Sequence, residues 1–387
     1  MMDPVLTQFA TVRQLEYIEA INTHGSHRKA ARALGISSGT IGMSMLAVKR
    51  KAALAGYSPE HHLTRPIAPG LKMRGTSQLF KQGQAAPVLE WIKTSADEEA
   101  RAAAQKAAFE AMSEELPRLA PIAPPAGTLG HLCNLYTLTD SHVGMLAWHK
   151  EGGADWDLKI AEETLIRCFE QMVVNSPAAA VGFVNQLGDF LHYDSALSPV
   201  TPLHGNALDA DGRMPKMVKT AVRILRHVVD FALARHERVV VLLAEGNHDI
   251  SSSVWLRTMF QALYENEPRV VVIDSELPYY VHQHGQTMLA FHHGHLKKND
   301  QLPILFAAQF PVIWGATTKR YAHTGHRHHV EEKEHSGITV HQHPTLAARD
   351  AFAARGGWIA ERQVTSLTYH DRFGEVARNT ITPEMVQ

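Results

Sequence analysis

Five short segments of the chain carry side chains suited to binding metal ions, and each follows an apolar run. They are Asp140-Ser141-His142 after residues 135–139, Gly188-Asp189 after 181–187, Gly246-Asn247-His248-Asp249 after 239–244, His292-His293-Gly294-His295 after 288–291, and Gly325-His326-Arg327-His328 after Tyr321. Together they offer carboxylates, one amide oxygen and several imidazoles. This mixture suits first-row divalent ions such as Mn²⁺, Fe²⁺ or Zn²⁺ better than Ca²⁺ or an iron–sulfur cluster.

The elements that must position these segments form an alternating α/β pattern. Apolar runs at 135–139, 181–187, 239–243 and 270–273 are typical of buried strands, and amphipathic helices are expected between them at 160–174, 217–235 and 254–264. After residue 278 the pattern changes to strands and hairpins, at 279–282, 288–291, 338–341 and 364–369. Since ligands gather beyond the carboxyl ends of strands in such sheets, we expect the five segments to converge on one pocket.

Histidine is unusually frequent in the same part of the chain. Of the 25 histidines, 12 lie between His282 and His343. Any single Asp or Asn after a strand could instead cap a helix or a turn. The ordered set of five segments makes a shared site the better explanation.

The order of these motifs resembles the calcineurin-like metallophosphoesterase superfamily. The motifs are Asp-x-His, Gly-Asp, Gly-Asn-His-Asp, a His before Gly, and Gly-His-x-His, and the resemblance covers roughly residues 131–345. Within the superfamily, the likeness is to DNA-repair-exonuclease-type members, including phage-borne forms with a leading helix-turn-helix. The resemblance implies a four-layer α/β/β/α sandwich that hydrolyses phosphate esters with two metal ions.

The resemblance also implies which residues bind the metals. Asp140, His142, Asp189 and His328 would hold one ion, and Asp189, Asn247, His293 and His326 the other, with Asp189 as the bridge. Two divalent ions are therefore expected as cofactors, with Mn²⁺ favoured and Fe²⁺, Zn²⁺ or Ni²⁺ as alternatives. Two ions about 3.5–4 Å apart can clamp a phosphoryl group, and they lower the pKa of a water between them enough to supply hydroxide near neutral pH.

Other polar residues take supporting roles in this scheme. His248 would protonate the leaving oxygen or stabilise the charge of the transition state, with Asp249 or another carboxylate orienting its ring. Arg327, Lys297 and Lys298 could contact substrate phosphate, although surface lysines are often only solvated. The remaining histidines are expected to support the site or the fold rather than to bind metal; they include His192, His323, His329, His335, His341 and His343.

Two features depart from a minimal phosphoesterase. The connection 191–216 after Gly188-Asp189 is long and rich in Pro and Gly, so it could form a lid or shape the substrate pocket. The run from His292 to His295 offers three histidines for one ligand role. We choose His293 because the family places that ligand directly before the Gly.

Residues 1–60 are expected to form a small all-α domain, with helices at 12–22, 28–34 and 38–55 and with Ser26 capping the second helix. The small, turn and core positions of a helix-turn-helix motif are occupied by Ala31, Gly35 and Ile41. Ser44 stands where the motif usually has an apolar residue, so Met43 or Met45 would have to fill that place.

DNA contacts would come from the start of the third helix and from the basic run near its end. The candidate residues are Ser38, Thr40, Lys49, Arg50 and Lys51. Residues 1–60 carry seven Lys and Arg against four Asp and Glu, a net charge of +3, which favours a polyanionic partner. A three-helix protein-interaction module is the alternative.

Residues 61–130 are expected to connect this domain to the phosphoesterase domain at 131–387. Residues 73–80 and 88–92 flank a turn and could pair as a hairpin. Ser95 and Glu98 form a capping box for an Ala/Glu-rich helix that would run to about residue 115. Four prolines and two glycines in residues 117–130 indicate a semi-rigid linker.

The composition excludes several other classes of protein. The 387 residues are too many for one small core, and a net charge of −1 excludes a disordered polyanion. Two cysteines, Cys133 and Cys168, exclude a disulfide scaffold and a thiolate metal cluster. Since there is neither an apolar run of about 18 residues nor a secretory signal, we expect no membrane partner and a cytoplasmic location, in a bacterial or phage-infected cell.

The favoured function is that of a metal-dependent phosphodiesterase that processes DNA as a nuclease, and a homodimer is compatible with the sequence. DNA as the substrate follows from the N-terminal segment alone, because one fold can serve many substrates. The first alternative is a cyclic-nucleotide or other small-molecule phosphodiesterase or phosphatase with a regulatory N-terminal domain. The second is a DNA-binding regulator with a structural metal domain, and the complete set of Asp140, Asp189, Asn247 and His248 argues against it.

Overall fold

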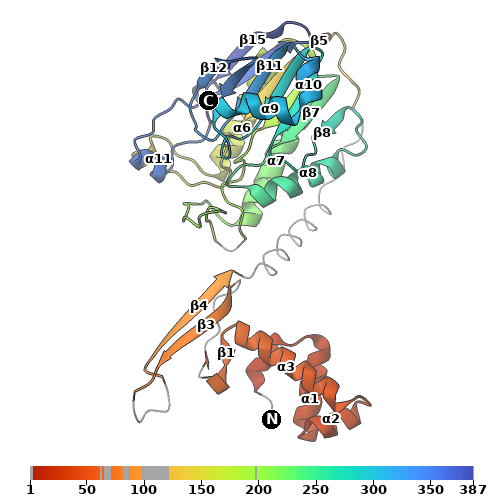
Figure 1. Cartoon of the computed structure of the whole chain (residues 1–387), viewed down its shortest axis with the longest axis vertical. Coiled ribbons are helices and arrows are strands. Elements are labelled where there is room, and N and C mark those ends of the chain that lie inside the picture. The colour runs from red at the N-terminus through yellow and green to blue at the C-terminus, as the bar shows by residue number, and fades with distance from the viewer. Residues whose placement is uncertain are drawn as a thin grey trace. The chain divides into compact units, whose positions relative to one another are not determined.

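The computed structural model describes residues 3–61, 63–64, 71–81, 87–96, 122–196 and 198–386, with the backbone alone for 64, 71–72, 89–90 and 94–96. The predicted Ala/Glu-rich helix beyond residue 96 and the linker up to residue 121 lie outside the described residues. The chain divides into two compact units, Met1–Ala104 and Gln105–Gln387 (Figure 1). No helix in the described part of the chain is long and apolar enough to cross a membrane.

The first unit begins with a helical core. Its helices are η1 Pro4–Phe9, α1 Val12–His24, α2 His27–Ala33 and α3 Ser38–Leu54, followed by β1 Tyr57–Ser58, η2 Pro59–His61 and β2 Leu63–Thr64. A capping box at Thr11 begins α1, and the predicted cap is confirmed because the Ser26 hydroxyl accepts from the Lys29 N–H. Gly25, in the left-handed conformation, ends α1.

The residues that carried the helix-turn-helix prediction occupy core and turn positions of the helical core, and the motif itself stays a prediction. Ala31 and Ile41 are buried between the helices, and Gly35 has a φ of 66°. Met45 fills the apolar place beside Ser44, whereas Met43 is exposed. These contacts explain the packing of three helices, and DNA binding by them stays a prediction.

The predicted hairpin of the first unit is confirmed. Strands β3 Leu71–Leu79 and β4 Leu89–Ala96 pair antiparallel, with a register shift between Met73 and Gly75. The amide of Gln78 on this hairpin donates to the main-chain oxygen of His61.

The second unit contains two β-sheets. The larger sheet has the order β15-β14-β5-β6-β7-β8, with strands β5 Leu129–Leu138, β6 Ala179–Gln186, β7 Arg238–Leu243, β8 Val270–Val272, β14 Val364–His370 and β15 Gly374–Ile381. The smaller has the order β12-β13-β11-β10-β9, with strands β9 Tyr280–His284, β10 Thr287–Phe291, β11 Lys319–Thr324, β12 Glu331–His335 and β13 Ile338–Gln342. In the larger sheet, β5, β6, β7 and β8 pair in this order, each parallel to the next. In the smaller sheet, β11 pairs parallel with both β10 and β13.

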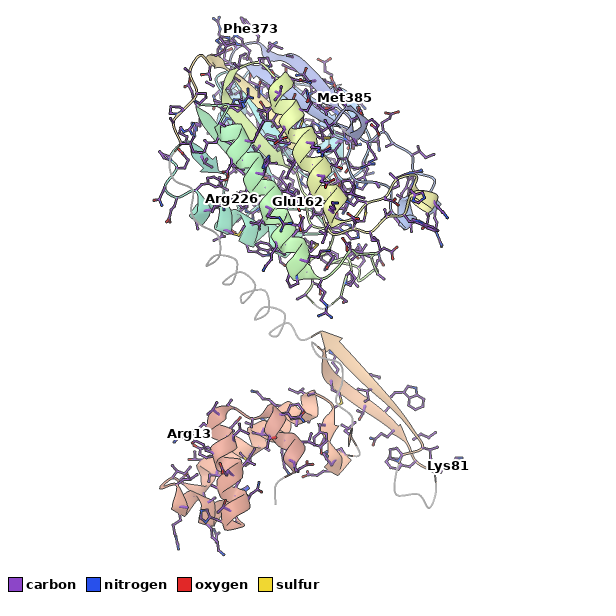
Figure 2. All side chains as sticks on the ribbon, turned by 180° about the vertical axis from the view of Figure 1, so that it is seen from behind. Arg13, Lys81, Glu162, Arg226, Phe373 and Met385 are labelled. Carbon is purple, nitrogen blue, oxygen red and sulfur yellow. The ribbon has the colours of Figure 1, made fainter. Side chains whose placement is uncertain are left out.

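Helices cover the outer faces of both sheets. The helices of this unit are α5 His149–Gly152, α6 Leu158–Asn175, α7 Met214–Leu233, α8 Ile250–Leu263, α9 Leu302–Gln309, α10 Pro311–Ala316 and α11 Ala351–Arg355, with η3 Asn299–Gln301 and η4 Pro383–Val386. Figure 2 shows α6 and α7 side by side over the larger sheet, and the Arg223 guanidinium joins them by donating to Glu162.

Three apolar clusters hold the layers together. The inner faces of the sheets meet through residues such as Leu135, Phe183 and Phe291. A second cluster packs α6, α7 and α8 on the larger sheet, and a third packs α9 and α10 on the smaller one. The second unit is therefore an α/β/β/α arrangement, as predicted for residues 131–387.

Three strands of the second unit were given no predicted range: β11, where only Tyr321 was named, lies inside the smaller sheet, and β12 and β15 lie at sheet edges. β12 carries Glu331, Glu332, Lys333 and Glu334, and β15 alternates half-buried and exposed residues around Arg378, between two buried ends. Charged side chains at edge strands discourage pairing with another chain, so these strands lack an apolar signal.

Candidate metal centre

The five predicted segments follow β5, β6, β7, β10 and β11, and the structure brings them together. These strands run parallel within their sheets, so their carboxyl ends meet at one side of the sandwich. Two groups of donor atoms form there, and within each group the atoms lie within 4.8 Å of one another. The first group is Asp140, His142 and His328, and the second is Asp189, His293 and His326. Six of the seven predicted metal ligands thus lie in two sets of three.

The first set is organised around the Asp140 carboxylate, which is fully buried. Its Oδ1 lies 3.1 Å from Nε2 of His328. The N–H of His326 donates to both of its oxygens, and the hydroxyl of Thr139 donates to Oδ2 at 2.6 Å. The carboxylate is thereby held in one orientation beside the ring that would share its ion.

The second set joins the first through His293. The Nδ1–H of His293 donates to the main-chain oxygen of Leu187 at 2.8 Å, so Nε2 is the ring atom left for a ligand. This Nε2 lies 3.1 Å from Oδ2 of Asp189 and 3.8 Å from Oδ1 of Asp140. The two carboxylates therefore flank one imidazole, an arrangement suited to two neighbouring cations.

Asn247 supplies the predicted amide ligand. Its Oδ1 is buried and has no hydrogen-bond partner among the described residues. The next residue, His248, donates its N–H to Oδ1 of Asp189 at 2.8 Å, which ties this loop to the second donor set. Because a buried oxygen without a donor is unfavourable, Asn247 fits a place beside a cation.

The electrostatics of the site favour positive charge between the carboxylates. Burial alone would raise the pKa of Asp140, but His328 and His293 outweigh it and hold that pKa below its ordinary value. Burial likewise opposes protonation of His293, yet Asp189 and Asp140 raise its pKa to about 10. Two ionised carboxylates that draw a charge onto an imidazole would attract a divalent ion in the same way.

Two other rings of the site have a lowered pKa, which favours the neutral form that binds metal, whereas Asp140 raises the pKa of His328 despite its burial. Burial and the neighbouring His248 lower the pKa of His142 well below its ordinary value. Burial and His293 lower the pKa of His326. The donor chemistry thus fits two divalent ions held by Asp, Asn and neutral His.

The backbone of the site is strained at the predicted ligands. Among the residues that the structure describes, five that are not glycine have a positive φ: Asp140 at 50°, His142 at 42°, Asp189 at 48°, His326 at 68° and His328 at 58°. Such conformations cost about 1–3 kcal/mol each and are concentrated at functional sites. All five belong to the predicted metal ligands.

Gly246 allows two of the loops to approach closely. A Cβ at this position would overlap the main-chain nitrogen and Oδ1 of Asp189. The glycine before Asn247 is therefore required by packing against the carboxylate predicted to bridge the ions.

We expect Gly246→Ala to displace Asp189 and to lower the free energy of unfolding by about 1–3 kcal/mol or more. Urea unfolding and metal content by elemental analysis measure both effects. Gly315→Ala is the matched control, because Gly315 lies in α10 with no atom near its missing Cβ, and alanine there should stabilise by about 0.5–1 kcal/mol. Unchanged stability and metal content in Gly246→Ala would contradict the close packing.

The structure corrects the predicted partner of His248. Its Nδ1 lies 2.7 Å from the main-chain oxygen of His192, which accepts the Nδ1–H and leaves Nε2 to exchange protons. The Asp249 carboxylate does not face this ring atom. It accepts the N–H groups of four residues, namely Asp189, Phe190, Leu191 and Gly246, so it positions the loops rather than the imidazole.

Asp249→Asn should therefore act on stability more than on chemistry. Burial and Asp189 raise the pKa of Asp249 to about 8, while the four N–H donors favour its ionised form. The NH₂ group of the new asparagine would face main-chain N–H groups that the carboxylate oxygen now accepts. Those hydrogen bonds would be lost, at a cost of about 1–3 kcal/mol in the free energy of unfolding. Thermal unfolding should show the loss, and a variant with native stability but a large loss of rate would restore Asp249 to a catalytic role.

His192 supports the site, as expected, and it also takes part in a group of donor atoms. Besides holding His248, it places its Nδ1 3.3 Å from Nδ1 of His142, and the three rings form a third donor group. Burial lowers the pKa of His192 to about 3. Its position three residues after Asp189 on the same loop was the available signal.

The other crowded histidines lie outside the donor groups found among the described residues. His323, His341 and His343 stack in the smaller sheet, where Nδ1 of His323 lies 2.9 Å from Nε2 of His343. His292 faces the main-chain oxygen of Pro278 instead of the donor sets, whereas His293 enters them.

The donor sets open onto a cleft of about 1510 Å³. His142, Asp189, Asn247 and His248 line its floor, and the predicted phosphate contacts Arg327, Lys297 and Lys298 line it as well. Residues 201–209 of the long connection after β6 form part of the same cleft. A cleft of this size exceeds the roughly 300–1,000 Å³ of sites for small ligands.

No protein-family model and no curated protein sequence matches the chain. Similar solved structures include a phosphoesterase from E. coli, with 16% identity over 64% of this chain and 98% of that one and a TM-score of 0.34. An archaeal phosphodiesterase has 12% identity over 64% and 98%, with a TM-score of 0.33. Vps29 from Entamoeba histolytica complexed with zinc has 12% identity over 65% and 99%, with a TM-score of 0.27. At these identities and TM-scores, any conclusion on function depends on the arrangement of side chains described above.

Proposed function

We propose that the chain is a metal-dependent phosphodiesterase that acts on DNA. The observation that carries this proposal is the pair of donor sets, Asp140, His142 and His328 beside Asp189, His293 and His326. They share one buried edge of the sandwich and open onto a cleft. Mn²⁺ is the favoured ion, because carboxylate, amide and imidazole ligands suit it.

Two divalent ions in these sets would neutralise the charge of a phosphoryl group and supply hydroxide from water. The residues of the chain would do the rest. Asp189, whose oxygens face His293 and the His248 N–H, would hold both ions at a fixed separation. Nε2 of His248, with Nδ1 held by the His192 carbonyl, would give a proton to the departing oxygen.

Charge supports nucleic acid as the substrate class. Residues 1–96 contain 12 Lys and Arg against five Asp and Glu, a net charge of +7, although the whole chain carries −1. Of the predicted DNA contacts, the start of α3 at Ser38 and Thr40 is exposed, whereas Lys49 is paired with Glu60 at 2.6 Å. A basic N-terminal unit would attract a polyanion to the chain.

A substrate panel tests the proposal. The full chain would be incubated with single-stranded DNA, duplex DNA, RNA and a cyclic nucleotide, each with and without Mn²⁺. We expect DNA to be hydrolysed only with the metal. Hydrolysis of the cyclic nucleotide with DNA untouched would instead favour a small-molecule phosphodiesterase, and no hydrolysis of any ester would refute the proposal.

A further inference from the structure

One wall of the cleft carries exposed aromatic side chains. Phe352 and Trp358 line the same cavity as the donor sets, and they are 72% and 59% exposed. Ile359 beside them is 81% exposed. Large apolar side chains that are exposed together on the wall of a cavity often mark a ligand-binding surface.

The local structure holds the indole in place. Asp350 caps α11 by accepting the N–H of Ala353, and the chain turns back so that the N–H of Trp358 donates to Ala353. The rings of Phe352 and Trp358 have centroids 5.1 Å apart at 66°. The indole lies against Gly356, where a Cβ would come within 3.0–3.2 Å of the ring. One side of Trp358 is therefore supported by the chain, and much of the ring stays open to solvent.

The cleft thus combines two kinds of surface. Lys297, Lys298 and Arg327 and the predicted ions would take phosphate. The aromatic wall also carries Asp350 and Glu361 beside Arg349 and Arg362, so its formal charges cancel and it offers no net charge to a ligand. A ligand that fits both surfaces has an anionic phosphate and a planar, uncharged ring.

From this arrangement we infer that Trp358, with Phe352, is a stacking site for a nucleobase of the substrate strand. This inference rests on the proposed function, and it names the part of the substrate that the aromatic wall binds. The base must be unpaired, because a base within a duplex has its faces covered by its neighbours. Stacking on an aromatic ring tolerates any sequence, since every base has a flat face.

The test compares two ligands that differ only by the base. Binding of thymidine 5′-monophosphate and of deoxyribose 5-phosphate to the Mn²⁺-loaded full chain would be measured by calorimetry. We expect the wild type to prefer the nucleotide, and Trp358→Ala to weaken nucleotide binding on the order of 5- to 150-fold while sparing deoxyribose 5-phosphate. Trp358→Phe should retain most of the preference.

Trp148→Ala is the matched control, because Trp148 is similarly exposed, at 56%, and lies outside the cavity lining. A wild type without preference for the nucleotide, or equal losses for both ligands in Trp358→Ala, would overturn the stacking site. Hydrolysis of DNA with normal nucleotide binding by Trp358→Ala would leave the proposed function standing and refute the inference. Base-dependent binding without hydrolysis of any ester would support the stacking site and refute the proposed function.

Discussion

Replacing Asp189 with Asn should abolish metal-dependent hydrolysis. Oδ2 of Asp189 lies 3.1 Å from Nε2 of His293, and Oδ1 accepts the N–H of His248 at 2.8 Å. The amide would keep the size of the side chain but remove the charge and one ligand oxygen. Because two-metal catalysis lowers the activation barrier by several kcal/mol, we expect kcat to fall roughly a thousandfold or more when it is lost.

The measurement is the rate of cleavage of a bis-aryl phosphodiester with Mn²⁺, together with metal content by elemental analysis. Asp230→Asn is the matched control, since Asp230 lies on α7 and accepts from the hydroxyl of Tyr264 away from the donor sets. We expect that variant to keep its rate and its metal. A normal turnover in Asp189→Asn would remove Asp189 from the site.

Much of the second unit could be predicted because its strands are buried on both faces. The runs that became β6 and β7 are nearly continuous apolar segments, and their ends were predicted to within about three residues. β12 was missed because four of its five residues are charged. An edge strand needs pairing on one side only, so its composition resembles that of a loop.

The metal centre was predictable for a related reason. Each ligand follows directly after a strand, so chain order alone brought Asp140, Asp189 and Asn247 to one edge of the sandwich. Roles that depend on main-chain contacts left no such pattern. Asp249 or another carboxylate was expected to orient the His248 ring. The Asp249 carboxylate instead accepts four N–H groups, and the ring is held by the carbonyl of His192.

The aromatic wall had no sequence signal either. Phe352 and Trp358 fall between β13 and β14, in a segment with one short helix and no strand. They meet the cleft only because α11 and the turn after it lie beside the loops of distant strands. Long-range proximity of this kind depends on the tertiary fold, which periodicity in one segment does not encode.

His248→Ala should lower the rate without removing the metals. Its Nδ1 is held by the His192 carbonyl, and the ring lies at the cleft with Nε2 free to give a proton to the leaving oxygen. General acid catalysis contributes about 10²–10⁴-fold. We expect a loss of this size for an alkyl leaving group, which needs protonation, and a smaller loss for a nitrophenolate, which leaves readily without it.

The ratio of the two losses separates proton donation from structural damage, since a distorted site would slow both esters alike. His227→Ala serves as control, because His227 lies on α7 against Glu170 and outside the cleft lining. His248 also belongs to a donor group with His142 and His192, so elemental analysis must accompany the kinetics. Loss of an ion in His248→Ala would make this residue a ligand, and equal losses for both esters would refute its role as the proton donor.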